Sequence, residues 1–227
     1  LGIGLGSLSL TVFILILAAA EGLSRDAFPS HPRLWTAPDR RAAGSREVVG
    51  AVLGGYVGAA LFLAYAVAMA RFGSERLGWW MPSSTLVDPS LLGSAAPGIA
   101  PVFTSFMAGL TEECLFRAVP LAGAVLLGRR FGRIRLWVGA VLVLQALVFG
   151  AAHSNYPTMP GWARMVELFI PALCFGAVYL RFGLIPGILI HFLYDLVWMG
   201  LPVFAARDSG AGLSCAILAA FALAPLA

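Results

Sequence analysis

Long apolar runs recur along the whole chain, and they constrain its fold more than any other feature. A helix that crosses a bilayer needs about 20 mostly apolar residues. Of the 227 residues, 60% are hydrophobic and 11% are charged, whereas soluble domains carry about 25% charged residues. The chain is therefore predicted to be all-α, a polytopic transmembrane helix bundle with about seven to eight spans. The predicted spans lie near residues 2–20, 47–70, 98–127, 135–156, 163–181, 184–200 and 211–227.

The apolar runs continue from one end of the sequence to the other. No soluble-looking block of 50 or more residues interrupts them, so residues 1–227 are interpreted as a single membrane domain. Residues 73–96 differ, because they are only half apolar and contain the aromatic pair Trp79 and Trp80. This composition predicts an interfacial or re-entrant connection.

Three glycines follow a regular spacing in the span 47–70. Gly50, Gly54 and Gly58 form two overlapping GxxxG patterns. This spacing lets helix backbones approach closely in lipid. We therefore predict that this face of the helix packs against a neighbouring helix.

Arginines supply all 15 basic residues of the chain. The absence of lysine excludes a Schiff-base lysine, a Walker A lysine and a Ser/Lys dyad. The net charge of +4 indicates membrane topology and no nucleic-acid partner, because the arginines flank apolar segments. Ten of them follow the first, third and fifth spans, against four in the opposite loops, so the loops that hold the ten are predicted to be cytoplasmic. The ten are Arg25, Arg33, Arg40, Arg41, Arg46, Arg129, Arg130, Arg133, Arg135 and Arg181.

The sequence "EECLFR" places charges inside the third span. An ionisable residue near a helix centre costs roughly 2.5–3.5 kcal/mol on insertion scales, so such a residue is a functional-site hypothesis. Glu113 and Arg117 are four residues apart and can form an ion pair along an α-helix. Glu112 then points about 100 degrees away and is free to face a cavity. A structural charge cluster that locks helices together is the alternative interpretation.

Two histidine motifs follow on later helices. Phe149 and His153 are four residues apart, with Gln145 one turn earlier on the same face, and His191 and Asp195 have the same spacing. A lone membrane histidine is more often a hydrogen-bonded core residue. A carboxylate, two imidazoles and a second acid on three helices are nevertheless the groups that activate water and stabilise an oxyanion. The remaining histidine, in an arginine- and proline-rich loop, is His31.

The ordered motifs EExxxR, FxxxH and HxxxN/D resemble the CPBP or Abi group, which contains type II CAAX prenyl endopeptidases and bacteriocin-processing intramembrane proteases. The resemblance covers residues 98–200 and implies a catalytic CPBP-like core. It also implies that Glu112 and His153 activate the attacking water, while His191 and Asp195 stabilise the tetrahedral oxyanion. The supporting residues implied by the resemblance are Glu113, Arg117 and Phe149.

The acid at position 195 departs from the eukaryotic CAAX enzymes, which carry asparagine there. An ionised Asp195 would repel an oxyanion, so it must be protonated, orient His191 or bind a metal. Glutamate with two histidines can bind zinc and leave a fourth position for water. A metal-free, glutamate-type mechanism fits the same residues. Both options stay open, and the leading interpretation requires no cofactor.

The sequence thus predicts an intramembrane endopeptidase that hydrolyses a peptide bond of a membrane-associated peptide or protein. We expect an integral protein of the bacterial inner membrane. The arginine pattern places His153 near the exterior end of its span, so either the site opens toward the exterior half and serves exported substrates, or the orientation is the reverse of the one predicted. One alternative is a non-catalytic membrane scaffold or immunity protein with the same pocket, sensitive to surface changes in residues 73–96. Another is a small proton-coupled carrier that uses Glu112 and Asp195, although no internal repeat is evident.

Overall fold

The computed structural model describes residues 2–37, 39–81, 93, 96–206 and 211–226. Within these ranges the regular secondary structure is helical, and an isolated bridge joins Trp80 and Met159. The predicted all-α helix bundle is therefore confirmed. The helices are α1 (Gly2–Ala27), α2 (Arg40–Ala43), α3 (Arg46–Leu77), α5 (Ile99–Glu112), the π-helix η2 (Glu113–Ala118), α6 (Val119–Phe131), α7 (Ile134–Ala152), α8 (Ala163–Phe182), α9 (Leu184–Ala205) and α10 (Ala211–Leu223), with short 3-10 turns η1 (Leu34–Thr36) and η3 (Ala224–Leu226).

Each predicted span falls on a helix or on a continuous helical segment. Four helices of the described chain, α3, α7, α8 and α9, are long and apolar enough to cross a membrane by length and composition. The third predicted span is the segment formed by α5, η2 and α6, and α10 with η3 is a shorter apolar helix. The predicted connection at 73–96 starts later than expected, because α3 continues to Leu77. Residues 82–92 and 94–95 of that connection lie outside the described residues.

Local sequence signals set both ends of α3. The hydroxyl of Ser45 accepts a hydrogen bond from the backbone N–H of Val48 (3.2 Å), which caps the first turn. At the other end Gly78 has a positive φ of 66°, and its N–H donates to the carbonyl of Gly73. Glycine adopts this left-handed conformation without a Cβ penalty, so the helix ends there.

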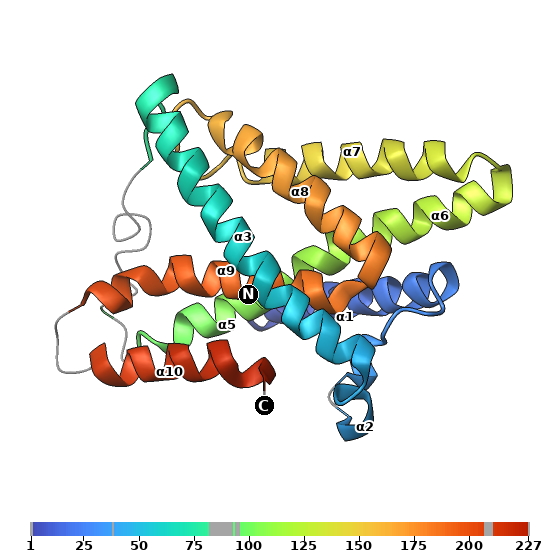
Figure 1. Ribbon diagram of the computed structural model, residues 1–227, viewed down its shortest axis with the longest axis horizontal. Helices are drawn as coiled ribbons and strands as arrows, with labels where there is room; N and C mark the ends of the chain where they lie inside the picture. The colour runs from blue at the N-terminus through green and yellow to red at the C-terminus, as the bar shows by residue number, and fades with distance from the viewer. Residues whose placement is uncertain (1, 38, 82–92, 94–95, 207–210, 227) are drawn as a thin grey trace.

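The α9 helix lies at the centre of the bundle. It contacts α3, α5, η2, α8 and α10, and most of its residues between Leu184 and Val203 are buried. Figure 1 shows α3 crossing the bundle, while α6 and α7 form an antiparallel hairpin, with α8 packed on α7 and α1 packed on α6. A polar residue near the middle of α9 is therefore surrounded by several other helices, and His191 occupies such a position.

Close packing of α3 on α9 uses a different face from the one predicted. A Cβ on Gly58 would meet the side chain of Ile190, but one on Gly50 or Gly54 would meet no atom within 4 Å. The GxxxG prediction is therefore wrong for Gly50 and Gly54 and correct for Gly58. With 3.6 residues per turn, the buried face instead follows the small residues Ala51, Gly55, Ala59 and Ala66.

Two adjacent glycines offer a matched test of this packing. A Cβ at Gly55 would lie 2.7–3.0 Å from atoms of the Leu189 side chain, whereas one at Gly54 would be free. We expect Gly55→Val to destabilise the protein by about 1–3 kcal/mol relative to Gly54→Val, because overpacking moves α3 away from α9. Both substitutions change helix propensity equally, and unfolding in detergent measures the difference. Equal stabilities of the two variants would contradict the observed α3–α9 contact.

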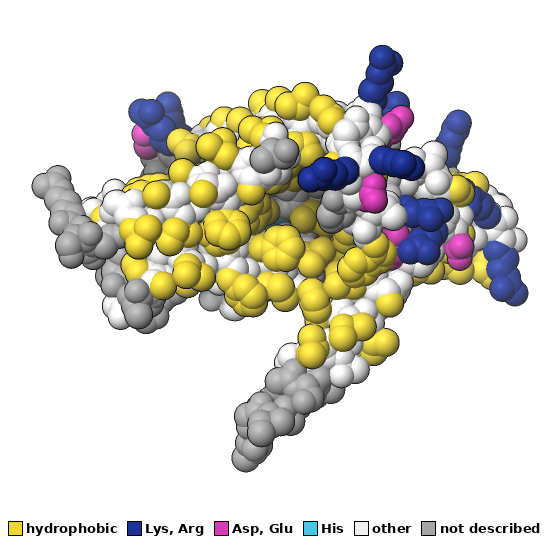
Figure 2. Space-filling view, turned by 90° about the horizontal axis from the view of Figure 1, so that it is seen from below, with side chains coloured by type: hydrophobic (Ala, Val, Ile, Leu, Met, Phe, Trp, Pro, Cys, Tyr) yellow, Lys and Arg dark blue, Asp and Glu magenta, His cyan; other side chains and the backbone are white. Residues whose placement is uncertain are grey.

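Most exposed arginines gather toward one end of the molecule, dark blue on the right of Figure 2, and a smaller dark blue group lies on the left. The larger group comes from the end of α1, from α2 and the start of α3, and from the α6–α7 and α8–α9 turns. Large apolar side chains are exposed on much of the remaining surface, in keeping with contact to lipid. The loops predicted to be cytoplasmic therefore share one end of the bundle.

Candidate functional site

The first motif lies where the helix changes its winding. The α5 helix ends at Glu112, and residues Glu113–Ala118 form the π-helical turn η2 before α6 begins. Pro120 has no backbone N–H, so the carbonyl of Phe116 lacks its usual α-helical donor, which favours a change of winding here. Single π-helical turns inside helices occur frequently at functional sites.

Side chains of the three motifs converge on one carboxylate oxygen. Glu112 Oε2 lies 3.6 Å from His153 Nε2 and 3.7 Å from His191 Nε2. Asp195 Oδ2 lies 3.5 Å from the same nitrogen of His191. Glu112 Oε2 is buried and has no hydrogen-bond partner among the described residues. The structure therefore brings together the four residues predicted to be catalytic.

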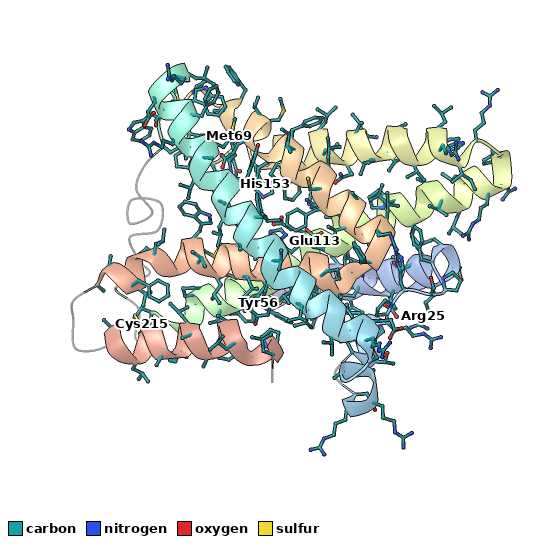
Figure 3. All side chains as sticks on the ribbon, viewed as in Figure 1. Arg25, Tyr56, Met69, Glu113, His153 and Cys215 are labelled. Atoms are coloured by element: carbon teal, nitrogen blue, oxygen red, sulfur yellow. The ribbon has the colours of Figure 1, made fainter. Side chains whose placement is uncertain are left out.

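Hydrogen bonds at Nδ1 orient both imidazole rings. His153 Nδ1 lies 2.8 Å from the carbonyl oxygen of Phe149, and His191 Nδ1 lies 3.0 Å from Glu113 Oε1. A carbonyl oxygen accepts only, so Nδ1 of His153 is the donor, and the neutral ring keeps its lone pair on Nε2. That lone pair faces Glu112. Figure 3 shows His153 and Glu113 in the middle of the bundle, well away from Arg25 at the arginine-rich end.

Glu113 and Arg117 form the predicted ion pair, and both are enclosed. Arg117 Nη1 lies 3.5 Å from Glu113 Oε1, and their side chains are 0% and 1% exposed. The Arg117 guanidinium lies over the ring of Phe149, 3.9 Å from its centroid, and 5.1 Å from that of Phe175. These cation–π contacts partly replace the hydration that the buried guanidinium loses.

The sequence interpretation missed the contact between Glu113 and His191. Glu113 joins Arg117 on its own helical segment to the histidine on α9, so it links the first and third motifs. Gly187 makes room for this contact, since a Cβ there would lie 3.1 Å from Glu113 Oε2. Gly187 precedes His191 by one helical turn, and that spacing is the signal that could have indicated a close approach.

Two polar residues singled out by the sequence lie outside the site. Gln145 Nε2 donates to the carbonyls of Leu142 and Ala172, so it joins α7 to α8. His31 packs beside the α8–α9 turn and stacks on Phe28 with ring centroids 4.6 Å apart. Burial, with a smaller contribution from the nearby charge of Arg181, lowers the pKa of His31. Its role there is packing.

A second polar group, also missed, lies beside His153. Arg164, near the start of α8, donates from Nη1 to Glu167 Oε1 at 2.9 Å. Its Cζ lies 5.2 Å from the ring centroid of Tyr156. The Tyr156 ring stacks on the His153 ring, with centroids 5.8 Å apart. Arg164 is one of the four arginines of the opposite loops in the topology prediction, and its i,i+3 spacing from Glu167 at the start of an apolar run is the signal that indicates the pair.

In the part of the chain that the structure describes, no group of three or more His, Cys, Asp or Glu side chains is arranged to hold a metal ion. The nitrogen and oxygen atoms that face one another belong to Glu112, His153, His191 and Asp195.

Residues 95–197 match the family model described as Type II CAAX prenyl endopeptidase Rce1-like. The matched segment contains the three motifs and the four converging side chains. Searches for similar curated proteins and for similar solved structures gave no match. The family that this model describes implies CAAX-type intramembrane endopeptidase activity for the matched segment. The resemblance carried by the three motifs is thus confirmed: residues 95–197 are similar to the Type II CAAX prenyl endopeptidase Rce1-like family, which matches the CPBP/Abi group of CAAX protease-like proteins.

Proposed function

We propose that the chain is an intramembrane endopeptidase in which Glu112 is the general base. The observation that carries this proposal is the convergence of two imidazole Nε2 atoms on Glu112 Oε2, at 3.6 and 3.7 Å. These separations exceed a direct hydrogen bond, but a water oxygen beside the pair can lie about 2.8 Å from both Glu112 and His153. Such a water is held by the Glu112 carboxylate, which accepts its hydrogen bond, and is positioned to attack a peptide carbonyl.

The reaction then follows from the side chains present. Glu112 removes a proton from the water, and the water oxygen forms a bond to the carbonyl carbon of the scissile peptide. The negative charge moves to the carbonyl oxygen, which accepts a hydrogen bond from His191. When the tetrahedral intermediate collapses, the C–N bond breaks and Glu112 returns its proton to the leaving nitrogen. One water is consumed, and one carboxylic acid and one amine are formed.

In this mechanism the role of Asp195 is to orient the His191 ring. Its Oδ2 lies 3.5 Å from His191 Nε2, and Glu113 holds the opposite nitrogen at 3.0 Å. Two carboxylates flanking the ring favour the positive charge that an imidazole carries when it stabilises an oxyanion. The repulsion between Asp195 and the oxyanion is then offset by the imidazolium that lies between them.

The metal-free form of this mechanism has a direct test. We expect the purified protein to retain its activity on a fluorogenic peptide library in detergent after treatment with EDTA and 1,10-phenanthroline, because the base and the donors are side chains. Metal content measured by mass spectrometry should be well below one ion per chain. A zinc protease in the same detergent is the control for chelation. Activity that is lost on chelation and restored by zinc would contradict the metal-free mechanism and favour the zinc alternative.

The substrate expected for this site is a membrane-associated peptide or protein. The site lies among apolar helices whose outer surfaces expose large apolar side chains, so a substrate reaches it from the bilayer or from its surface. If the chain is a scaffold with the same pocket, the library is left uncut although the protein is folded. That outcome would contradict the proposed activity.

A further inference from the structure

Arg164 pairs with Glu167 and lies beside the Tyr194 hydroxyl, yet one of its donors has no partner among the described residues. Its Nη1 is paired with Glu167 at 2.9 Å, but its Nε is buried and has no hydrogen-bond partner in the described structure. The side chain as a whole is 16% exposed, so part of it can be reached from outside. A buried charged donor without a partner is costly, and a bound ligand that supplies an acceptor removes that cost.

The position of Arg164 relates it to the reacting groups. Its guanidinium packs on the Tyr156 ring, 5.2 Å from the centroid, and Tyr156 stacks on His153 with the ring planes only 16° apart. One aromatic ring therefore separates Arg164 from the Glu112–His153 pair. At this separation Arg164 does not contact the attacking water. It lies within reach of a part of an extended peptide a few residues from the cleaved bond, at about 3.3 Å per residue.

The other arginines of the described chain do not combine partial exposure with a position beside the Glu112–His153 pair. Arg117 is closer to Glu112 in sequence, but it is 0% exposed and enclosed by two phenylalanine rings. Arg71 and Arg76 lie on the exposed end of α3, and Arg71 is paired with Glu75. The remaining ones lie at the arginine-rich end of the bundle. Among the arginines that the structure describes, Arg164 alone is both partly exposed and adjacent to the site.

We propose that Arg164 is a specificity-determining residue that binds a carboxylate of the substrate. A guanidinium presents two N–H groups in a planar fork that matches a carboxylate. Glu112 and Asp195 repel a carboxylate from the reacting centre itself, so Arg164 is the place beside the site where the negative group is accepted. The carboxylate comes either from the C-terminus of the peptide or from an aspartate or glutamate side chain. This inference rests on the proposed peptidase function.

Binding measurements separate this proposal from catalysis. The full chain with Glu112→Gln, purified in detergent, is mixed with a fluorescent library of apolar decapeptides in matched forms. One form has a free C-terminal carboxylate, the second a C-terminal amide, and the third an amide with one internal aspartate in place of asparagine. We expect one carboxylate form to bind at least about tenfold more tightly than the plain amide, as for hydrogen bonds to charged groups. Which form binds more tightly identifies the source of the carboxylate.

The variants Arg164→Gln and Arg164→Lys then test the residue. In Arg164→Gln the tighter binding of the carboxylate peptide over the plain amide should disappear. Lysine keeps the charge but lacks the fork, so Arg164→Lys should reduce the preference at least about threefold even if the glutamine variant does not fold. Arg71→Gln, on an exposed part of α3, should leave it unchanged. No preference in the parent protein, or a preference that Arg164→Lys leaves intact, overturns the proposal. Hydrolysis of the same peptides by the chain with Glu112 present tests the peptidase function separately.

Discussion

Glu112→Gln is expected to lower peptide hydrolysis by about 10²–10⁴-fold, the range that positioned general bases contribute. Glutamine has nearly the shape of glutamate, so the contacts with His153 and His191 lose their charge but keep their geometry. The amide cannot take a proton from water. The effect should therefore appear in kcat, while KM for the same peptide changes little.

The control for this prediction is Glu75→Gln. Glu75 is an exposed glutamate of α3, so its substitution changes the same functional group far from the site. His153→Ala should cause a loss comparable to that of Glu112→Gln, and the double variant should be little worse than either, because the two residues act on one water. If Glu112→Gln and His153→Ala both keep full activity while folded, Glu112 is not the base.

The helices could be predicted from the sequence because hydropathy determines them. Runs of about 20 apolar residues have few alternatives to a helix in lipid, since every backbone polar group must be satisfied within the segment. The convergence of Glu112, His153 and His191 was predictable for a similar reason. Each is a costly residue in an apolar helix, and three such residues in one bundle are less costly when they face one another.

Contacts that depend on how helices approach one another could not be predicted. The spacing of Gly50, Gly54 and Gly58 resembles a packing motif, but the position of α9 selects the face that contains Gly55 instead. The same holds for Glu113, whose contact with His191 depends on how α9 packs against the η2 segment. The Glu113 carboxylate reaches His191, 78 positions later in the sequence.

The largest effect on stability is expected from breaking the Glu113–Arg117 pair. Either Glu113→Gln or Arg117→Met alone should destabilise the protein by about 3–5 kcal/mol, because each leaves the other charge buried without its partner. Glu113→Gln should also lower the peptidase rate, since the carboxylate holds His191 Nδ1 at 3.0 Å. Unfolding in mixed detergent micelles measures the first effect, and hydrolysis at saturating peptide measures the second.

The double variant separates a charge cluster that only locks helices together from one that serves the reaction. Removing both charges restores part of the stability, because no uncompensated charge remains. The activity should not return with it, because His191 still lacks the carboxylate that orients it. The exposed pair Arg71–Glu75 has the same i,i+4 separation, and its double replacement by glutamine should change stability by less than about 1 kcal/mol. Recovery of both stability and activity in the Glu113→Gln, Arg117→Met protein would show that Glu113 contributes only to packing, and that His191 is positioned by α9 alone.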